Sequence, residues 1–247
     1  MSEIQKIVIV GAGSRIAEHC ARLWAAKAAC SFVLVGRDPA RLQAIAQDLR
    51  ARSPASTVDV AAVDFEDAVA IRRLVDDLGS VDVALIAHGS LPDQRACEQD
   101  LAQCERALVV NGLSPVLFAE AFAGPMERAG KGTIAIIGSV AGDRARKSNY
   151  VYGAAKGLVE KYAQGLQHRF AFTAVRILLV KPGPTDTPMT AHLKQAGAKL
   201  ANVDDVARDI VDAVAAGKAQ LYTPGKWALI MMVIRNLPQR VFNHMNI

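Results

Sequence analysis

The chain of 247 residues has only four cysteines and no pattern that would bind a metal. Cys20, Cys30, Cys97 and Cys104 form no C-x-x-C pair, and the histidines show no metal-ligand spacing with them. We therefore expect reduced thiols, no metal and a cytoplasmic location, because disulfides are rare in the cytosol. The first six residues also lack a basic segment followed by a long apolar core, which argues against a secretory signal.

Linkers, charge blocks and internal repeats are missing as well, so nothing divides the chain into separate modules. The net charge of +5 and the pI near 9.1 could suggest nucleic-acid binding, but the basic residues are dispersed. Arg144, Arg146 and Lys147 form one short cluster without interleaved aromatics, so no nucleic-acid partner is expected. This cluster is read either as a solvated loop or as a site that steers an anionic substrate.

Apolar strand-like runs alternate with helical stretches along the chain. Strands are predicted near residues 4–10, 32–36, 58–63, 81–86, 132–138 and 174–180, with a short last strand that ends by residue 225. Such alternation predicts an α/β fold with a single Rossmann-type, doubly wound parallel sheet. Helices would cover both faces of the sheet, and a short apolar tail would follow it.

A glycine-containing turn comes directly after the first predicted strand. Gly11-Ala12-Gly13-Ser14-Arg15-Ile16 leads into a helical stretch that continues to Lys27. Glycines permit a tight turn, and the first amides of the helix would point at an anion such as a pyrophosphate. The match to G-x-G-x-x-G is incomplete, yet its place between a strand and a helix favours a nucleotide site.

Tyr152 and Lys156 lie four residues apart and would share one helix face. A cation near the phenol favours its ionised form, so we expect Lys156 to lower the pKa of Tyr152 and suit it to acid/base work. Ser139 follows the apolar run 133–137 and would stand at the carboxyl end of a strand. The alternatives are an ordinary solvated helix face for the pair and a turn or cap for the serine.

These segments resemble the short-chain dehydrogenase/reductase family over nearly the whole chain. The resemblance implies catalytic roles for Ser139, Tyr152, Lys156 and Asn111, with Asn111 holding a water that joins Lys156 to solvent. It also implies that the glycine-containing turn binds the cofactor, through Gly11, Gly13, Ser14, Arg15 and Ile16. The other cofactor-binding positions that it implies are Gly89, Tyr152, Lys156, Pro182, Gly183, Thr185 and Thr187.

The chain departs from the family pattern at several positions. Arg15 and Ala17 replace two glycines of the family loop, and N-N-A-G reads Ile86-Ala87-His88-Gly89 here. His88 is expected to be a structural histidine at a strand end, and the alternative is that it faces the cofactor ribose. Asp64 resembles the family aspartate that receives the adenine amino group; the alternative is a helix cap, for which Asp67 is better placed.

Charge after the second strand bears on the choice of cofactor. Arg37 stands where an acidic residue would select NAD, and an arginine there accepts the extra phosphate of NADP. Arg15 would add a second guanidinium. NADP is thus expected, with NAD as the alternative because Asp38 could reach the ribose instead. Solvated surface roles are the other reading of the two arginines.

The apolar run from Trp227 to Ile234 is too short to span a bilayer, which needs about 20 residues. Flanking cations and a tryptophan permit a peripheral contact with a membrane. Packing against the substrate cleft or another subunit is the equal alternative. We expect residues 1–225 to form a dinucleotide-binding catalytic domain, and residues 226–247 to be an apolar extension of it.

Several segments resemble the branch that contains the decaprenylphosphoryl-2-keto-ribose reductases, among them Ala87-His88-Gly89, 140–144, 148–153 and 186–190, together with the tail. This resemblance implies an NADPH-dependent carbonyl reductase of a lipid-linked keto-sugar, acting as a homodimer or homotetramer at the inner face of the membrane. Tyr150 and Met189 are candidate pocket residues. The alternatives are a reductase of a soluble ketone or acyl substrate, a non-catalytic nucleotide-binding regulator, and a membrane scaffold.

Overall fold

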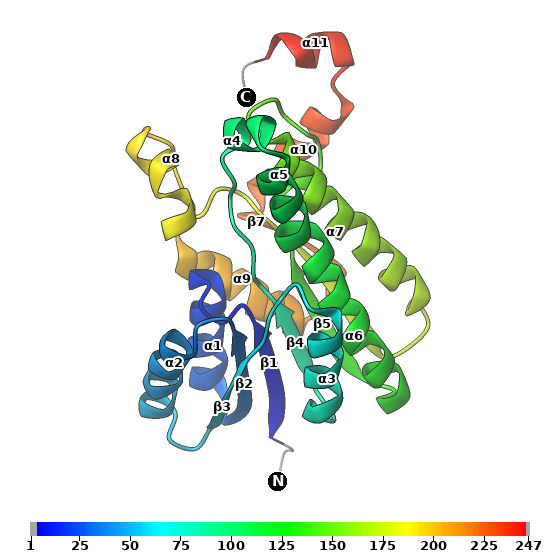
Figure 1. The fold of residues 1–247 in the computed structure, drawn as a ribbon. Helices are drawn as coiled ribbons and strands as arrows, with labels where there is room; N and C mark the ends of the chain where they lie inside the picture. The colour runs from blue at the N-terminus through cyan, green and yellow to red at the C-terminus, as the bar shows by residue number, and fades with distance from the viewer. Residues whose placement is uncertain (1–3, 246–247) are drawn as a thin grey trace.

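The computed structural model describes residues 4–245, and its centre is a sheet of seven parallel strands (Figure 1). The strands are β1 (Gln5–Val10), β2 (Cys30–Gly36), β3 (Thr57–Ala62), β4 (Val83–Ile86), β5 (Gly132–Ile137), β6 (Val175–Pro182) and β7 (Gln220–Thr223). They lie in the order β3-β2-β1-β4-β5-β6-β7, which confirms the predicted doubly wound sheet. The order changes direction between β1 and β4, and ligands of open parallel sheets bind beside such a point, at the carboxyl ends of the strands.

The strands are apolar on both faces because helices cover both faces. In β1, Ile7 and Ile9 belong to one core cluster, and Val8 and Val10 belong to the other. The first cluster includes residues of α1 (Arg15–Lys27), α2 (Pro39–Arg52) and α9 (Val203–Ala215). The second includes residues of α3 (Ala68–Leu78), α6 (Ser114–Ala129) and α7 (Tyr150–Arg169).

Aspartate side chains cap the helices that follow β2 and β3. The Asp38 carboxylate accepts a hydrogen bond of 3.2 Å from the Arg41 amide and so begins α2. The Asp67 carboxylate accepts from the amides of Val69 and Ala70 at the start of α3, which confirms Asp67 as the cap. These caps satisfy amides that have no partner within the helix.

A long helical stretch from Leu101 to Ala129 comprises α5 (Leu101–Leu108), the π-helical turn η1 (Val109–Leu113) and α6. By length and composition alone it could cross a membrane, with a mean hydropathy of 1.5, but 67% of its apolar window is buried within the protein. Its apolar side chains are therefore accounted for by packing against α3, β4 and β5.

Shorter elements gather at the carboxyl end of the sheet, at the top of Figure 1. They are α4 (Gln94–Gln99), η2 (Val140–Gly142), η3 (Pro188–Thr190) and α8 (Ala191–Gln195). The apolar tail forms two further helices at this end, α10 (Lys226–Asn236) and α11 (Gln239–His244). In α10 only Met231 is buried, so most of its apolar side chains are not covered by the rest of the chain.

Candidate functional site

Ser139 and Tyr152 meet at the carboxyl end of β5. Ser139 begins the turn η2, and its hydroxyl oxygen accepts a hydrogen bond of 3.1 Å from the Ala141 amide. The phenol of Tyr152 on α7 lies near the same hydroxyl, close enough for Ser139 to influence its ionisation. Two glycines allow the turn η2 and the helix α7 to lie this close together. A side chain at Gly142 would meet the backbone of Lys156, and one at Gly153 would meet the Ala141 carbonyl.

Lys156 is buried one helical turn beyond Tyr152, with 3% of its surface exposed. Its ammonium donates a hydrogen bond of 2.9 Å to the Ile137 carbonyl and lies 5.8 Å from the centre of the Tyr152 ring. Burial lowers the pKa of Lys156 to about 8. The sequence therefore placed the pair correctly on one helix face.

The ionisation of Tyr152 differs from the sequence-based expectation. Burial raises the pKa of Tyr152 to about 12, and the neighbouring Ser139 hydroxyl opposes this rise only in part. Within the protein alone, desolvation of the phenolate thus sets the direction of the shift. The phenol is protonated at neutral pH and can act as a proton donor.

Asn111 is fully buried in the π-helical turn η1. Its side-chain amide nitrogen donates a hydrogen bond of 2.9 Å to the Ala107 carbonyl. In a regular α-helix that carbonyl would instead accept from the backbone amide of residue 111. The side-chain amide oxygen of Asn111 accepts 2.8 Å from the backbone amide of Ser90. A side chain at Gly89 would lie 2.9 Å from this oxygen and 3.7 Å from the Lys156 ammonium, so both groups border the same glycine.

The glycine-containing turn lies between β1 and α1, as predicted. Gly11 has a φ of +79°, and a side chain there would overlap the backbone of His88. Ser14 precedes α1 without a side-chain capping bond, and Arg15 and Ile16 open the helix. The first amides of α1 therefore have no partner within the helix and can face an anion.

His88 has the structural role that the sequence suggested. Its Nε2 is hydrogen-bonded to the Ser114 hydroxyl at 2.8 Å, and its ring lies 4.5 Å from that of Phe65 between centroids. Burial, reinforced by the charges of Lys156 and Arg37, lowers the pKa of His88 to about 3. This neutral ring ties the loop after β4 to the start of α6.

Three arginines surround the end of β2 and the glycine-containing turn, but they are not equivalent. The Arg37 guanidinium lies 5.9 Å from the centre of the Phe65 ring. Arg15 forms an ion pair of 2.9 Å with Glu18 on its own helix, so its charge is already partnered. Arg41, which sequence reasoning missed, donates to the Gly13 carbonyl. Arg41 lies within α2 and belongs to neither the glycine-containing turn nor the end of β2, so no sequence motif pointed to it.

The acidic residues in this region are also distinguished by their bonds. Asp38 is occupied as the cap of α2, which weakens its candidacy as a ribose-binding acid. Asp64 stands in the turn after β3, where its carboxylate accepts 2.9 Å from the Glu66 amide. It does not cap α3.

The segment after β6 lies against the tail. The Gly183 amide donates 3.0 Å to the Thr223 carbonyl, and a side chain at Gly183 would overlap the Trp227 ring. The buried Thr185 hydroxyl donates 3.0 Å to the Gly183 carbonyl, and Thr187 begins η3. Pro182, Gly183, Thr185 and Thr187 are thus held together as one turn at the carboxyl end of the sheet.

The predicted pocket residues and the basic cluster 144–147 match the sequence-based expectations only in part. Tyr150 at the start of α7 and Met189 in η3 are exposed, at 43% and 41%. Arg144 is not a solvated cation, because it donates 2.6 Å and 2.7 Å to the carbonyls of Ile234 and Leu237 in the tail. Any steering of an anion would therefore depend on Arg146 and Lys147.

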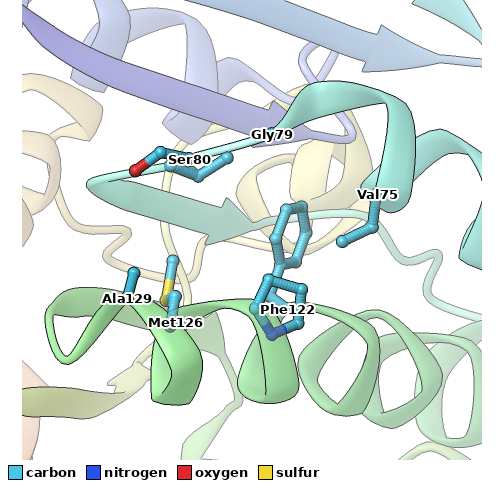
Figure 2. Close-up of a pocket in the computed structure, with 8 residues that line it drawn as sticks. Val75, Gly79, Ser80, Phe122, Met126 and Ala129 are labelled. Carbon is cyan, nitrogen blue, oxygen red and sulfur yellow. The ribbon is translucent and has the colours of Figure 1, made fainter.

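A small cavity lies elsewhere, between the end of α3 and the carboxyl-terminal half of α6 (Figure 2). Val75, Phe122 and Met126 line it, and it encloses about 10 Å³. This is about the room that one water molecule needs. None of the site residues described above lines it, so we do not assign it to the substrate.

Relatives in sequence extend over nearly the whole chain. The family model for short chain dehydrogenases matches residues 5–198. An uncharacterised oxidoreductase of Mycobacterium tuberculosis is 33% identical over 245 residues, which cover 97% of this chain and 96% of that protein. An uncharacterised oxidoreductase of Streptomyces coelicolor is 28% identical over 243 residues, covering 98% and 96%.

Solved structures share the fold. A short-chain dehydrogenase from Sphingobium yanoikuyae in complex with NADPH has a TM-score of 0.81 at 23% identity, covering 96% of this chain and 97% of that chain. The bulky-bulky ketone specific alcohol dehydrogenase from Comamonas testosteroni has a TM-score of 0.81 at 21% identity, covering 99% and 96%. Family model and sequence relatives together establish that this chain is an NAD(P)-dependent oxidoreductase of the short-chain dehydrogenase/reductase family.

Proposed function

We propose that the chain reduces a ketone with NADPH as the hydride source. The observation that carries the proposal is the nearness of the Ser139 hydroxyl to the protonated phenol of Tyr152, with Lys156 buried one turn away on the same helix. A hydroxyl and a phenol that lie near each other can both donate hydrogen bonds to one carbonyl oxygen. The residues also fit a dinucleotide, since Ser14 makes no capping bond and leaves the first amides of α1 free to bind a pyrophosphate.

In this mechanism bound NADPH supplies the hydride to the carbonyl carbon. Ser139 holds the carbonyl oxygen, and Tyr152 gives its proton to that oxygen as negative charge develops there. Lys156 stabilises the phenolate that results, because its ammonium lies on the same side of α7. Asn111 keeps the loop after β4 beside Lys156 through its bond to Ser90, and we assign it to proton return through water.

The test is turnover of ketones with NADPH by wild type and by Tyr152→Phe. This change keeps the ring and removes the proton donor, so turnover should fall at least about 100-fold while NADPH binding stays within about twofold. Tyr162→Phe is the matched control, because the Tyr162 hydroxyl donates 2.7 Å to Glu120 away from the site. Equal turnover in wild type and Tyr152→Phe would overturn the mechanism. NADPH binding without turnover of any ketone would favour the regulator.

We propose NADP as the preferred cofactor, with Arg37 and Arg41 as the residues that recognise its additional phosphate. Arg41 already contacts the glycine-containing turn, and Arg37 follows β2 directly. Asp38 is occupied by capping, so the carboxylate that would favour NAD is engaged elsewhere. The proposed cofactor site is completed by Gly11, Gly13, Ser14, Ile16, Asp64, Gly89 and the turn 182–187. Arg15 contributes less because its guanidinium is paired with Glu18, which also pairs with Arg22.

For the substrate we propose a lipid-linked keto-sugar, as in the branch that the sequence resembles. The tail supports a membrane contact, because Leu229, Met232 and Val233 are 64%, 52% and 53% exposed on α10. Residues 226–247 contain Lys226, Arg235 and Arg240 but no carboxylate side chain. An exposed apolar face with cations suits an anionic lipid surface. The protein would then be cytoplasmic and peripheral at the inner face of the membrane.

Vesicle sedimentation tests this contact. Wild type should sediment with vesicles that contain phosphatidylglycerol and far less with pure phosphatidylcholine, while Leu229→Glu/Val233→Glu should remain in solution. Phe172→Glu is the control, because Phe172 is a fully exposed apolar residue outside the tail. Equal sedimentation of the double variant and wild type would contradict the membrane contact. Faster turnover of small soluble ketones than of a lipid-linked keto-sugar would contradict the substrate assignment.

We propose a homodimer or homotetramer for the assembly. Leu108, Leu113 and Leu158 are 39%, 45% and 45% exposed around η1 and α7, where Gly112 lets the two segments approach closely. Pairing of these helices with those of a second copy would bury the three leucines. Leu113→Glu should shift the mass measured by light scattering to that of a monomer.

A further inference from the structure

A buried network of charged and hydroxyl groups lies behind the proposed site. It consists of Asp143 after η2, Glu160 on α7, Lys181 in β6 and Tyr222 in β7, and we name it the Asp143 network. The Asp143 side chain is fully buried and forms an ion pair with Lys181, whose own side chain is 1% exposed. The Tyr222 hydroxyl donates 2.9 Å to Asp143, and the Lys181 ammonium lies 2.8 Å from Glu160.

The network keeps its lysine charged despite burial. Burial by itself would lower the pKa of Lys181, but the hydrogen bonds and charges of Asp143 and Glu160 together raise it. Buried charges tolerate little displacement, because a group that loses its partner is left desolvated and unpaired. The four side chains are therefore held in one arrangement.

Three of the four members of the network lie close in sequence to a part of the proposed site. Asp143 is four residues after Ser139, Glu160 is four residues after Lys156, and Lys181 directly precedes Pro182. The turn between Ser139 and Asp143 is closed by bonds from the Gly142 amide to the Ser139 carbonyl, 3.1 Å, and from the Asp143 amide to the Val140 carbonyl, 3.2 Å. A displacement of Asp143 would thus be transmitted to Ser139.

Arg144 extends the connection to the tail. Beyond its bonds to the carbonyls of Ile234 and Leu237, its guanidinium lies 3.2 Å from Gln239 and 3.9 Å from the centre of the Phe242 ring. One side of the turn 143–144 is therefore fixed to the buried network, and the other side is fixed to α10 and α11.

We propose that Asp143 is a positioning residue, which fixes the turn that carries Ser139 by its bonds to Lys181 and Tyr222. The proposal rests on the proposed function in that Ser139 is taken as the group that holds the substrate carbonyl. Asp143 itself contacts no reacting atom. Its role is to keep the serine hydroxyl beside the Tyr152 phenol.

Tyr222→Phe is the mildest test, because it removes one hydroxyl from Asp143 and leaves the ring in place. Tyr162→Phe is the matched control, since it removes a hydroxyl that donates to a carboxylate of Glu120 outside the network. We expect kcat for ketone reduction to fall roughly tenfold in Tyr222→Phe only, because small misplacements of reacting groups slow catalysis strongly. The Kd for NADPH should stay within about twofold of wild type in both variants.

Hydrogen exchange gives a second measurement that needs no substrate. Amides 140–144 should exchange faster in Tyr222→Phe and at the wild-type rate in Tyr162→Phe. Faster exchange together with the selective loss of kcat supports the proposal. Unchanged exchange in Tyr222→Phe, or equal losses of kcat in both variants, overturns it. If wild type reduces no ketone, the proposed function fails, while the exchange comparison still decides whether Asp143 fixes the turn.

Discussion

Lys156→Met should make the protein more stable at neutral pH while it abolishes turnover. Burial moves the pKa of Lys156 from an ordinary 10.5 to about 8. Since a change of one in pKa corresponds to about 1.4 kcal/mol, the charged form is disfavoured by about 3 kcal/mol in the folded chain. Methionine has a similar length and carries no charge, so it removes this cost. The lost hydrogen bond to Ile137 offsets about 1 kcal/mol, which leaves a gain of about 2 kcal/mol.

The predicted gain in the free energy of unfolding should depend on pH. A base with a lower pKa in the folded state binds fewer protons there than in the unfolded chain, so the free energy of unfolding rises with pH between the two values. For Lys156 this window runs from about 8 to 10.5, and the full penalty is present below it. The advantage of Lys156→Met over wild type should therefore be greatest at pH 7 and nearly gone above pH 10.5.

Urea unfolding at pH 7 and at the alkaline end of this window measures the difference. Lys161→Met on the exposed side of the same helix is the control, and it should change the free energy of unfolding by less than about 0.5 kcal/mol. A Lys156→Met variant that is less stable than wild type at pH 7 would refute the reasoning. So would an advantage that does not shrink as the pH rises.

Two further predictions concern the cofactor and the pH profile. Arg37→Ala and Arg41→Ala should each weaken NADPH binding by about 10-fold or more, as expected for a lost charge-assisted bond, and leave NADH binding unchanged. Fluorescence titration checks this, with exposed Arg73→Ala as the control; an equal loss for both cofactors would contradict phosphate recognition. Because the pKa of Tyr152 is about 12 and that of Lys156 about 8, kcat for reduction should decline near pH 8 as Lys156 loses its proton. In Lys156→Arg any decline of kcat should move to higher pH, because arginine keeps its proton. A decline that stays near pH 8 would show that another group causes it.

The sequence was most informative where a structural feature depends on neighbouring residues. Each apolar run predicted as a strand overlaps an observed strand, because parallel strands buried on both faces need continuous apolar residues. The spacing of Tyr152 and Lys156 fixed their common helix face, and the glycine-containing turn was placed correctly between β1 and α1. Asp67 was recognised as a cap because capping depends on residues within one turn.

The tertiary structure decided what depends on segments far apart in the chain. It brings Arg41 to Gly13, Arg144 to the tail about 90 residues later, and Lys181 to both Asp143 and Glu160. It also reversed the expected direction of the Tyr152 pKa, because desolvation is set by everything that surrounds the phenol. Local patterns therefore determined the sheet and the residues that face its carboxyl end. Close approach and burial, which no local pattern encodes, decided their partners and their charges.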